Sequence, residues 1–343
     1  MIESKDDGLA FSFADVHPSA HLHISFQRTL RIPDDDMTYP LPPGLGEFPL
    51  RHVDDFADNV PPAWLEHGGV MLPMYQSEAL WINFTAGYDD ERGVEYPCAV
   101  KIATGKIDAV TGQAWSPGLH RGPQDYMVAP GQPWLDGYCV EKGTIRQFVA
   151  MPLGQGYTAE EQITGKAEHG GLQIIVYPMK RDVFERRFPK LAPPPPGFRV
   201  DMVCCQAKSP SAPEMGLAPG GKMKQDIYED PYDFDDWDLT QSSRCYVHIA
   251  NSLMWNAITR QTAQYLPPTA AEYTSYGLPW FDYYDDALSA VEGSSILAKL
   301  KSVLDLAKEK RQTPLPENQS CDPQKVVKLK PKRVGAQVRE GTF

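Results

Sequence analysis

Proline is the residue that most limits how this chain can fold. The sequence holds 32 prolines and 27 glycines among 343 residues, whereas average usage would give about 17 prolines. Proline cannot donate a hydrogen bond to a sheet ladder, and it breaks helix interiors. We therefore expect few long helices and a chain built from short strands that are joined by many ordered turns and loops.

Hydrophobic patterns predict where the strands lie. Alternation of apolar and polar residues indicates a half-buried strand, a short continuous apolar run favours a central strand, and two runs around a glycine indicate a hairpin. The main examples are the alternating residues 21–32, the hairpin of residues 99–110, the apolar residues 172–179 and a later strand at residues 200–207. They predict a β-dominated α+β protein, with mostly antiparallel sheets arranged as a sandwich or distorted barrel and a few peripheral helices.

Three segments carry helix signals. Thr158 and Glu161 form a capping box, in which each side chain can bond the backbone amide of the other residue. Residues 294–310 show the clearest helical period, with an apolar stripe and lysines gathered toward the end that the helix dipole favours. We expect this helix to dock on a sheet. Residues 251–265 fit either a strand or a helix.

The chain is expected to form a single β-rich domain over residues 16–311. Residues 1–15 are expected to be flexible, and residues 312–343 to form an extended or disordered basic tail. This tail could dock on an acidic face of its own or a neighbouring subunit, which would make the protein a homo-oligomer. The proline-rich segment 192–197 is predicted to be a surface loop, with an internal domain boundary as the alternative.

Charge and cysteine usage limit the partners and the compartment. The net charge of −12 argues against nucleic acid or an anionic membrane as the main partner, because both attract basic surfaces. The six cysteines form no CxxC pair and no zinc-ligand spacing. The first residues do not resemble a secretory signal, and no apolar run reaches the roughly 18 residues of a membrane helix. These features predict a soluble cytoplasmic protein.

Two histidines on one predicted strand suggest a metal site. His21 and His23 are two residues apart, so both imidazoles lie on one face of the strand and can share a divalent metal ion. His248 or an acidic residue would have to complete the ligand set. The alternative is that both histidines lie on a solvated strand face.

A second candidate site lies in residues 124–179, where aromatic residues, glycine turns and isolated polar residues are dense. Trp134 and Asp136 come shortly before Arg146 and Gln147. An aromatic ring that stacks, together with a carboxylate, guanidinium or amide that orients, is typical of sites for sugars or other small polar ligands. The alternative is structural, with Trp134 in the core and Arg146 in an ion pair.

Two further segments are predicted to have structural roles. The acidic residues 229–238 predict a surface loop anchored by aromatic side chains, with a cation site or a dock for the basic tail as alternatives. The glycine-rich residues 215–224 lack the pattern of a phosphate-binding loop and predict a mobile turn that leads into a strand.

These observations leave two functional hypotheses. The favoured one is a binding or assembly protein whose partner is a small polar molecule or another protein, bound at an aromatic and polar pocket around residues 134–147. The alternative is a metal-dependent enzyme that uses His21 and His23.

Overall fold

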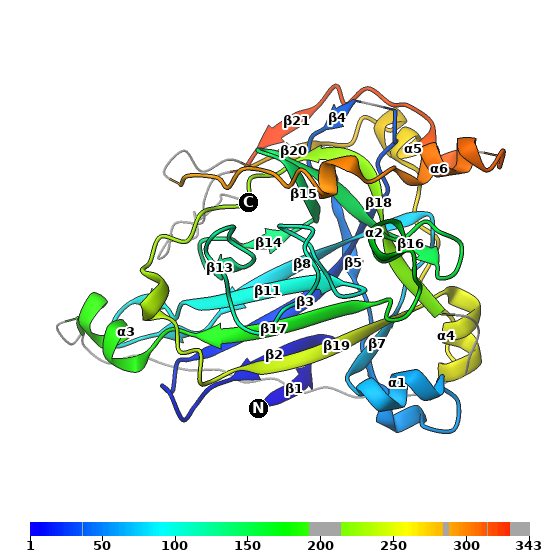
Figure 1. The fold of residues 1–343 in the computed structure, drawn as a ribbon. Coiled ribbons are helices and arrows are strands. Elements are labelled where there is room, and N and C mark those ends of the chain that lie inside the picture. The colour runs from blue at the N-terminus through cyan, green and yellow to red at the C-terminus, as the bar shows by residue number, and fades with distance from the viewer. Residues whose placement is uncertain (36, 192–213, 284–287, 314, 330–343) are drawn as a thin grey trace, which may run out of the picture.

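The computed structural model describes residues 1–35, 37–191, 214–283, 288–313 and 315–329. In this part of the chain one large, mostly antiparallel sheet joins 17 strands (Figure 1). The sheet does not close into a barrel. The predicted β-dominated α+β class is confirmed. A distorted barrel was one of the two expected forms, but the sheet is open. None of the described helices has the length and apolar character needed to cross a membrane.

Three long strands form the layer nearest the viewer in Figure 1. β17 (Leu172–Pro178) lies between β11 (Cys98–Thr104) and β19 (Ser243–Ala250) and pairs antiparallel with both. All residues of β17 are buried, so the central strand predicted from its continuous apolar run is confirmed. β11 turns through Gly105 into β12 (Ile107–Asp108), which confirms the predicted hairpin.

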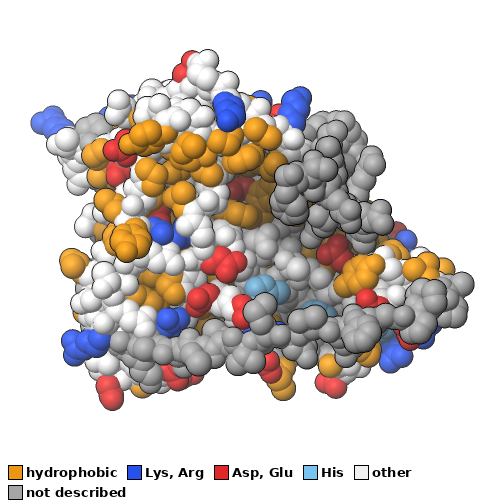
Figure 2. Space-filling model, turned by 180° about the vertical axis from the view of Figure 1, so that it is seen from behind, with side chains coloured by type: hydrophobic (Ala, Val, Ile, Leu, Met, Phe, Trp, Pro, Cys, Tyr) orange, Lys and Arg blue, Asp and Glu red, His pale blue; other side chains and the backbone are white. Residues whose placement is uncertain are grey.

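A second group of strands lies behind this layer. β3 (His21–Leu30) pairs antiparallel with β2 (Gly8–Ser12) and with β8 (Glu78–Ala86). β1 (Ile2–Lys5) forms a hairpin with β2, whose Phe11 is fully buried. This N-terminal hairpin differs from the flexible segment expected at residues 1–15, because its apolar side chains join the core. Seen from behind, the molecule is hollowed (Figure 2).

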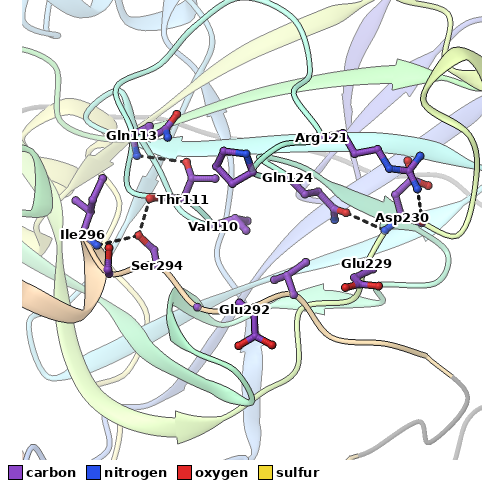
Figure 3. Close-up of a pocket in the computed structure, with 14 residues that line it drawn as sticks. Val110, Thr111, Gln113, Arg121, Gln124, Glu229, Asp230, Glu292, Ser294 and Ile296 are labelled. Atoms are coloured by element: carbon purple, nitrogen blue, oxygen red, sulfur yellow. Dashed lines mark hydrogen bonds between the residues drawn. The ribbon is translucent and has the colours of Figure 1, made fainter.

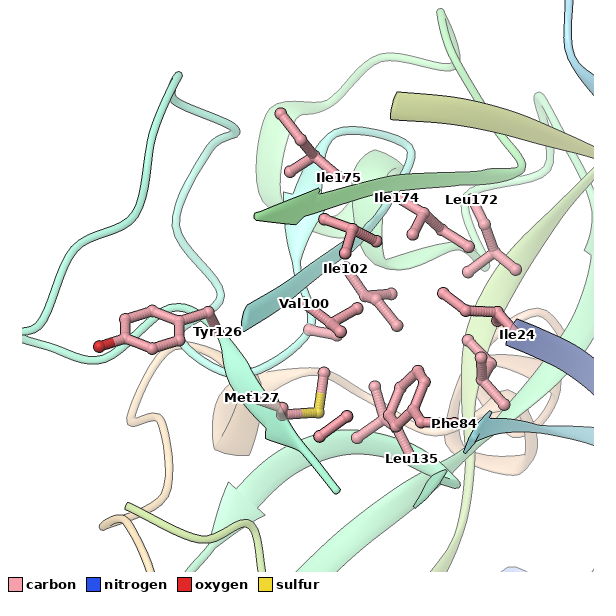
Figure 4. Packing of buried hydrophobic residues seen from close by; sticks show 14 of the residues in the cluster. Ile24, Phe84, Val100, Ile102, Tyr126, Met127, Leu135, Leu172, Ile174 and Ile175 are labelled. Carbon is pink, nitrogen blue, oxygen red and sulfur yellow. The ribbon is translucent and has the colours of Figure 1, made fainter. Parts of the chain in front are cut away.

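The main core fills the space between these two groups of strands. Alternate residues of β3 and β8, such as Ile24 and Phe84, meet Val100 and Ile102 of β11 and Ile174 of β17 (Figure 4). All five side chains are at most 5% exposed. Burying one such side chain contributes about 1.5–3 kcal/mol. Because apolar and polar residues alternate along β3 and β8, one face of these strands is apolar and packs in the core. The other face carries polar residues.

A third group of strands corrects the interpretation of the glycine-rich segment. β16 (Thr144–Pro152) pairs with β15 (Gly137–Glu141) and with β18 (Glu214–Lys224). The predicted mobile turn at residues 215–224 is therefore wrong, since these residues form the long strand β18. Its glycines are needed for close approach: a Cβ atom at Gly221 would lie 2.4 Å from the carbonyl oxygen of Pro33.

Short elements complete the sheet and close its ends. The capping box of Thr158 and Glu161 is present, and residues 251–265 contain a helix capped by Asn251. The helices are α1 (Pro62–His67), α2 (Ala159–Thr164), α3 (Arg181–Arg187), α4 (Ser252–Thr259) and α5 (Ala270–Ser275). The short strands are β4 (Thr38–Tyr39), β5 (Gly44–Glu47), β6 (Arg51–His52), β7 (Val70–Pro73), β9 (Tyr88–Asp89), β10 (Val94–Glu95), β13 (Met127–Ala129) and β14 (Trp134–Leu135).

The single helix predicted for residues 294–310 is wrong. The segment forms a 3-10 turn, η3 (Leu297–Lys299), and a separate helix, α6 (Val303–Glu309). Between them, the side chain of Gln162 donates to the carbonyl oxygen of Lys301 and accepts from its amide. Lys301 therefore bonds across to another part of the chain, and Ser302 starts a new helix. The expected docking is present, because α6 contacts β18 and η3 contacts β15.

The cap of α6 gives a first testable consequence. Ser302 accepts from the amide of Asp305, and the Asp305 carboxylate bonds back to Ser302. Replacing Ser302 with Ala removes this cap and should lower the free energy of unfolding by about 1 kcal/mol. The loss should be measurable by urea denaturation. A variant as stable as the natural protein would contradict the assignment of Ser302 as the start of α6.

The C-terminal residues return to the body of the protein before position 330. The 3-10 turn η4 (Pro316–Asn318) is followed by β21 (Val326–Lys328), which pairs in parallel with β20 (Trp280–Asp282). The strand expected at residues 200–207, the loop at 192–197 and residues 330–343 of the basic tail lie outside the described residues. Assembly through that tail stays a prediction.

Candidate functional site

A cleft of about 580 Å³ lies where three distant segments meet (Figure 3). The turn after β12 forms one wall, the residues before η3 form the second, and the loop after β18 forms the third. The residues that line it include Val110, Thr111, Arg121, Glu229, Glu292 and Ile296. This volume is within the range of about 300–1,000 Å³ that is usual for small-molecule sites.

The buried carboxylate of Asp108 fixes the first wall. It accepts hydrogen bonds from the amides of Val110 (3.1 Å) and Thr111 (2.7 Å) and from the hydroxyl of Thr111 (2.9 Å), all on Oδ1. Oδ2 is buried and has no partner among the described residues. Burial raises the pKa of Asp108 to about 7. The turn that carries Thr111 is thus rigid.

The second wall is bonded to the first. Ser294 Oγ donates to the carbonyl oxygen of Thr111 (2.5 Å) and accepts from the amides of Ile296 and Leu297 (3.2 Å each). Gly293 lies against β15, where a Cβ atom would be 2.2 Å from the Cα of Glu141. The hydroxyl of Ser294, like that of Thr111, is committed to holding the cleft in shape.

The acidic residues 229–238 supply the third wall. Asp230 is buried, and its carboxylate accepts from Tyr126 Oη (2.6 Å) and from Trp237 Nε1 (2.8 Å). Gln124 accepts from the Asp230 amide at 2.8 Å. Trp237 is itself buried, so an aromatic side chain anchors this loop, as the sequence predicts. The described residues contain no group of three side chains that could hold a metal ion there.

The cleft carries charges that their neighbours do not neutralise. Arg121 donates to the carbonyl oxygens of Tyr232 (2.6 Å) and Asp230 (3.2 Å), and no described carboxylate pairs with it. Glu229 is exposed; Lys142 interacts with it electrostatically, but no described residue lies within ion-pair distance of it. Glu292 pairs with Lys142 at 2.8 Å on the exposed rim. The cleft is therefore lined by a guanidinium that bonds only backbone carbonyls of the described residues and by one exposed carboxylate.

A buried ion pair supports the loop that carries Arg121. Lys101 is 1% exposed, and its ammonium donates to Asp125 Oδ2 (2.6 Å) and to the carbonyl oxygens of Ser116 and Gly118 (3.0 Å each). The Nδ1 atom of His120 lies 2.7 Å from the same Asp125 oxygen. Residues 116–125 are thus held around one buried cation.

The four residues predicted to bind a polar ligand fall into two pairs. Trp134 Nε1 donates to Asp136 Oδ2 at 2.5 Å, and burial raises the pKa of Asp136 to about 7. Arg146 pairs with Asp34 at 3.2 Å. Gln147 is fully buried and bonds the backbone of β3 and the residues after it. None of the four lines the cleft.

The three predicted metal ligands are also divided. His21 is exposed and His23 is half-buried, on the outward face of β3. His248 stacks between Trp64 and Tyr246, with ring centroids 4.5 Å from each. Its Nε2 bonds the carbonyl oxygen of Gly68, and burial lowers its pKa to about 3. Among the described residues no third ligand joins His21 and His23.

Of the charged residues of the cleft, only Glu229 carries a local signal in the sequence, because it opens the acidic segment 229–238. Arg121, Glu229 and Glu292 are single residues in loops that lie more than 60 positions apart, and only the fold brings them together. Comparison of the chain with protein-family models, curated protein sequences and solved structures gave no match. The site must therefore be interpreted from its own chemistry.

Proposed function

We propose that the protein is a non-catalytic binding protein whose ligand is a small zwitterion, such as an amino acid or a short peptide. The observation that carries this proposal is that Arg121 and Glu229 line one cleft and that neither forms an ion pair within the part of the chain that the structure describes. A ligand carboxylate would bind Arg121, and a ligand ammonium would bind Glu229. Hydrogen bonds in which both partners are charged are the strongest of their kind.

The remaining lining suits the body of such a ligand. Val110, Val291 and Ile296 offer apolar contact elsewhere in the cleft. Glu292 adds a second carboxylate on the rim, although Lys142 shares it. A ligand that carried only negative charge would meet Glu229 and Glu292 unfavourably, so the arrangement favours a molecule with both charges.

The hydrogen bonds of the two hydroxyl groups in the cleft favour a binding protein over an enzyme. A nucleophilic serine or threonine needs an adjacent base that takes its proton. Ser294 donates to a backbone carbonyl, which cannot take its proton, and the Asp108 oxygen that accepts from Thr111 also accepts from two backbone amides, so both hydroxyls serve the structure. The metal-dependent enzyme based on His21 and His23 has no further observation in its favour.

The proposal includes a cytoplasmic location. Cys98 and Cys139 are unpaired and buried, and burial raises the pKa of each thiol to about 12. Reduced, unreactive thiols fit the cytoplasm, where disulfides are rare.

Substitution of Glu229 with Gln tests the proposed site. Isothermal titration with a panel of amino acids and dipeptides should find a ligand, and the variant should bind that ligand about tenfold or more weakly because a charged hydrogen bond is lost. Glu168→Gln, which changes an exposed carboxylate in a different loop, is the matched control and should bind normally. Absence of binding by every member of the panel, or equal affinity in the Glu229 variant, would refute the proposal.

A further inference from the structure

The outward face of β3 and β8 is a second surface with the chemistry of a ligand site. Their register places Ser25 opposite Asn83 and Gln27 opposite Trp81. Directly paired residues of antiparallel strands direct their side chains to the same face. These four residues therefore lie on the face away from Ile24 and the core. The hollow seen from behind shows Asp, Glu and His side chains, with Lys and Arg side chains to one side of it and hydrophobic side chains gathered above it (Figure 2).

A second tryptophan joins this face from β14. Trp134 pairs with Asn83, while the next residue, Leu135, pairs with Ile82 and is fully buried in the core. The indole rings of Trp81 and Trp134 are 6.0 Å apart at an angle of 74°. The bond from Trp134 Nε1 to Asp136 fixes the second ring. Together they form an aromatic step on the sheet.

These two indoles differ from most tryptophans of the protein. Trp64, Trp237, Trp255 and Trp280 are buried in the core. Trp81 and Trp134 are only partly buried, although leaving a large aromatic ring in water is unfavourable. Gly44 of β5 lies beside the Trp81 ring, where a Cβ atom would be 3.7 Å from Cζ2, so no side chain from this position covers the ring.

Amide groups lie beside the aromatic step. Gln27 Nε2 donates to Glu47 Oε1 (2.6 Å) and to Ser25 Oγ (3.0 Å), and Asn83 Nδ2 donates to Thr85 Oγ1 (3.4 Å). These bonds orient both amides and leave their carbonyl oxygens without a partner among the described residues. Glu47 and Thr85 are exposed. The face thus offers fixed acceptors next to two rings.

We infer that the outward face of β3, β8 and β14 binds a neutral oligosaccharide. A sugar ring has an apolar C–H face that stacks on an indole and a hydroxyl edge that bonds amides and carboxylates. Trp81 and Trp134 supply the stacking surfaces, and Gln27, Asn83 and Glu47 supply the polar groups. This site is separate from the cleft and does not depend on the function proposed for it.

Charge selects a neutral sugar over other ligands that stack on aromatic rings. Single-stranded nucleic acid binds aromatic platforms within basic grooves, and sulfated sugars also need cations. Here Gln27 bonds the carboxylate of Glu47. The one described cation that lines the pocket at Trp134, Lys224, is accompanied there by Asp226, and the whole chain carries −12. Phosphate or sulfate groups would therefore be repelled, whereas uncharged hydroxyl groups can donate to Glu47.

Titration of the full chain with neutral hexasaccharides tests the inference. The panel contains cellohexaose, xylohexaose, laminarihexaose, maltohexaose and chitohexaose, with a heparin hexasaccharide as the charged comparison. At least one neutral sugar should bind and quench tryptophan fluorescence. Trp81→Ala should weaken that binding by about tenfold or more, and Trp81→Phe should retain part of it, because the ring still stacks. Asn83→Ala should weaken it to a smaller extent.

Two control variants show whether a loss of sugar binding is specific to this face. Tyr276→Ala removes a ring that is 78% exposed on α5 and should bind the sugar normally. Glu229→Gln should also bind the sugar normally, so that failure of the cleft proposal and failure of this one can be distinguished. No binding by any neutral sugar, unchanged binding by Trp81→Ala, or preferential binding of heparin would overturn the inference.

Discussion

Asp125→Ala is expected to destabilise the protein by about 3–5 kcal/mol. Asp125 is the only carboxylate bonded to the Lys101 ammonium within the described chain, and Lys101 is 1% exposed. Removing one partner of a buried ion pair leaves the other charge unpaired in an apolar environment, which is far less favourable than losing an exposed pair. The two carbonyl oxygens that also bond Lys101 cannot neutralise it. Urea denaturation at neutral pH should show the loss as a lower midpoint.

Two further variants identify the cause of this loss. Lys101→Met in combination with Asp125→Ala removes both charges and should recover much of the stability, because a neutral side chain tolerates burial. Lys301→Ala breaks an exposed pair with Glu309 and should change the free energy of unfolding by less than about 1 kcal/mol. A loss of that small size for Asp125→Ala would show that the buried pair contributes little.

The second large effect is a dependence of stability on pH that comes from His248. Burial lowers the pKa of His248 to about 3 in the folded protein, from 6.5 in the unfolded chain. Between these values the unfolded chain binds a proton that the folded protein does not, so stability falls as the pH falls from 6.5 toward 3. The shift corresponds to about 4 kcal/mol over this range, as an order of magnitude. His67, whose ring is 6.4 Å away, opposes protonation of His248 in the same direction.

His248→Gln should flatten this part of the stability profile. Glutamine does not titrate, and its amide can still donate to the carbonyl oxygen of Gly68, although the stack with Trp64 and Tyr246 is lost. The measurement is the difference in unfolding free energy between pH 7 and pH 4, which should be smaller in the variant whatever its absolute stability. His21→Gln, at an exposed position of β3, should keep the natural slope. Parallel profiles for His248→Gln and the natural protein would contradict the prediction.

The elements that the sequence predicts well are those whose signals are local. The alternation of Leu22, Ile24 and Phe26 is sufficient to indicate a strand with one buried face, and the structure has β3 there. The capping box of Thr158 and Glu161 is complete within four residues. In each case the residues that bond the backbone or fill the core are close together in the sequence. The local pattern is therefore sufficient to predict the structure.

The elements that it predicts poorly depend on distant partners. Residues 294–310 have a helical period, yet Gln162 bonds the backbone at Lys301 and two separate elements result. The glycines of β18 favour a turn when taken alone. In the structure these residues form a strand that pairs with β16. The strand needs glycine at positions such as Gly221, because the backbone at Pro33 lies too close for a Cβ atom. Neither contact can be predicted from the residues that are neighbours in the sequence.

The same division holds for the candidate sites. The sequence by itself determined that aromatic and polar residues gather near Trp134, and that the protein is β-dominated. Proline content and the alternation of apolar and polar residues determine the local conformation of the backbone. Only the tertiary structure decided that Trp134 lies beside Trp81 and Asn83, that Arg146 and Gln147 bond other segments, and that Arg121 and Glu229 line one cleft. Binding chemistry needs groups a few ångströms apart in space, and strand pairing brings together residues that the sequence separates by 50 to more than 100 positions.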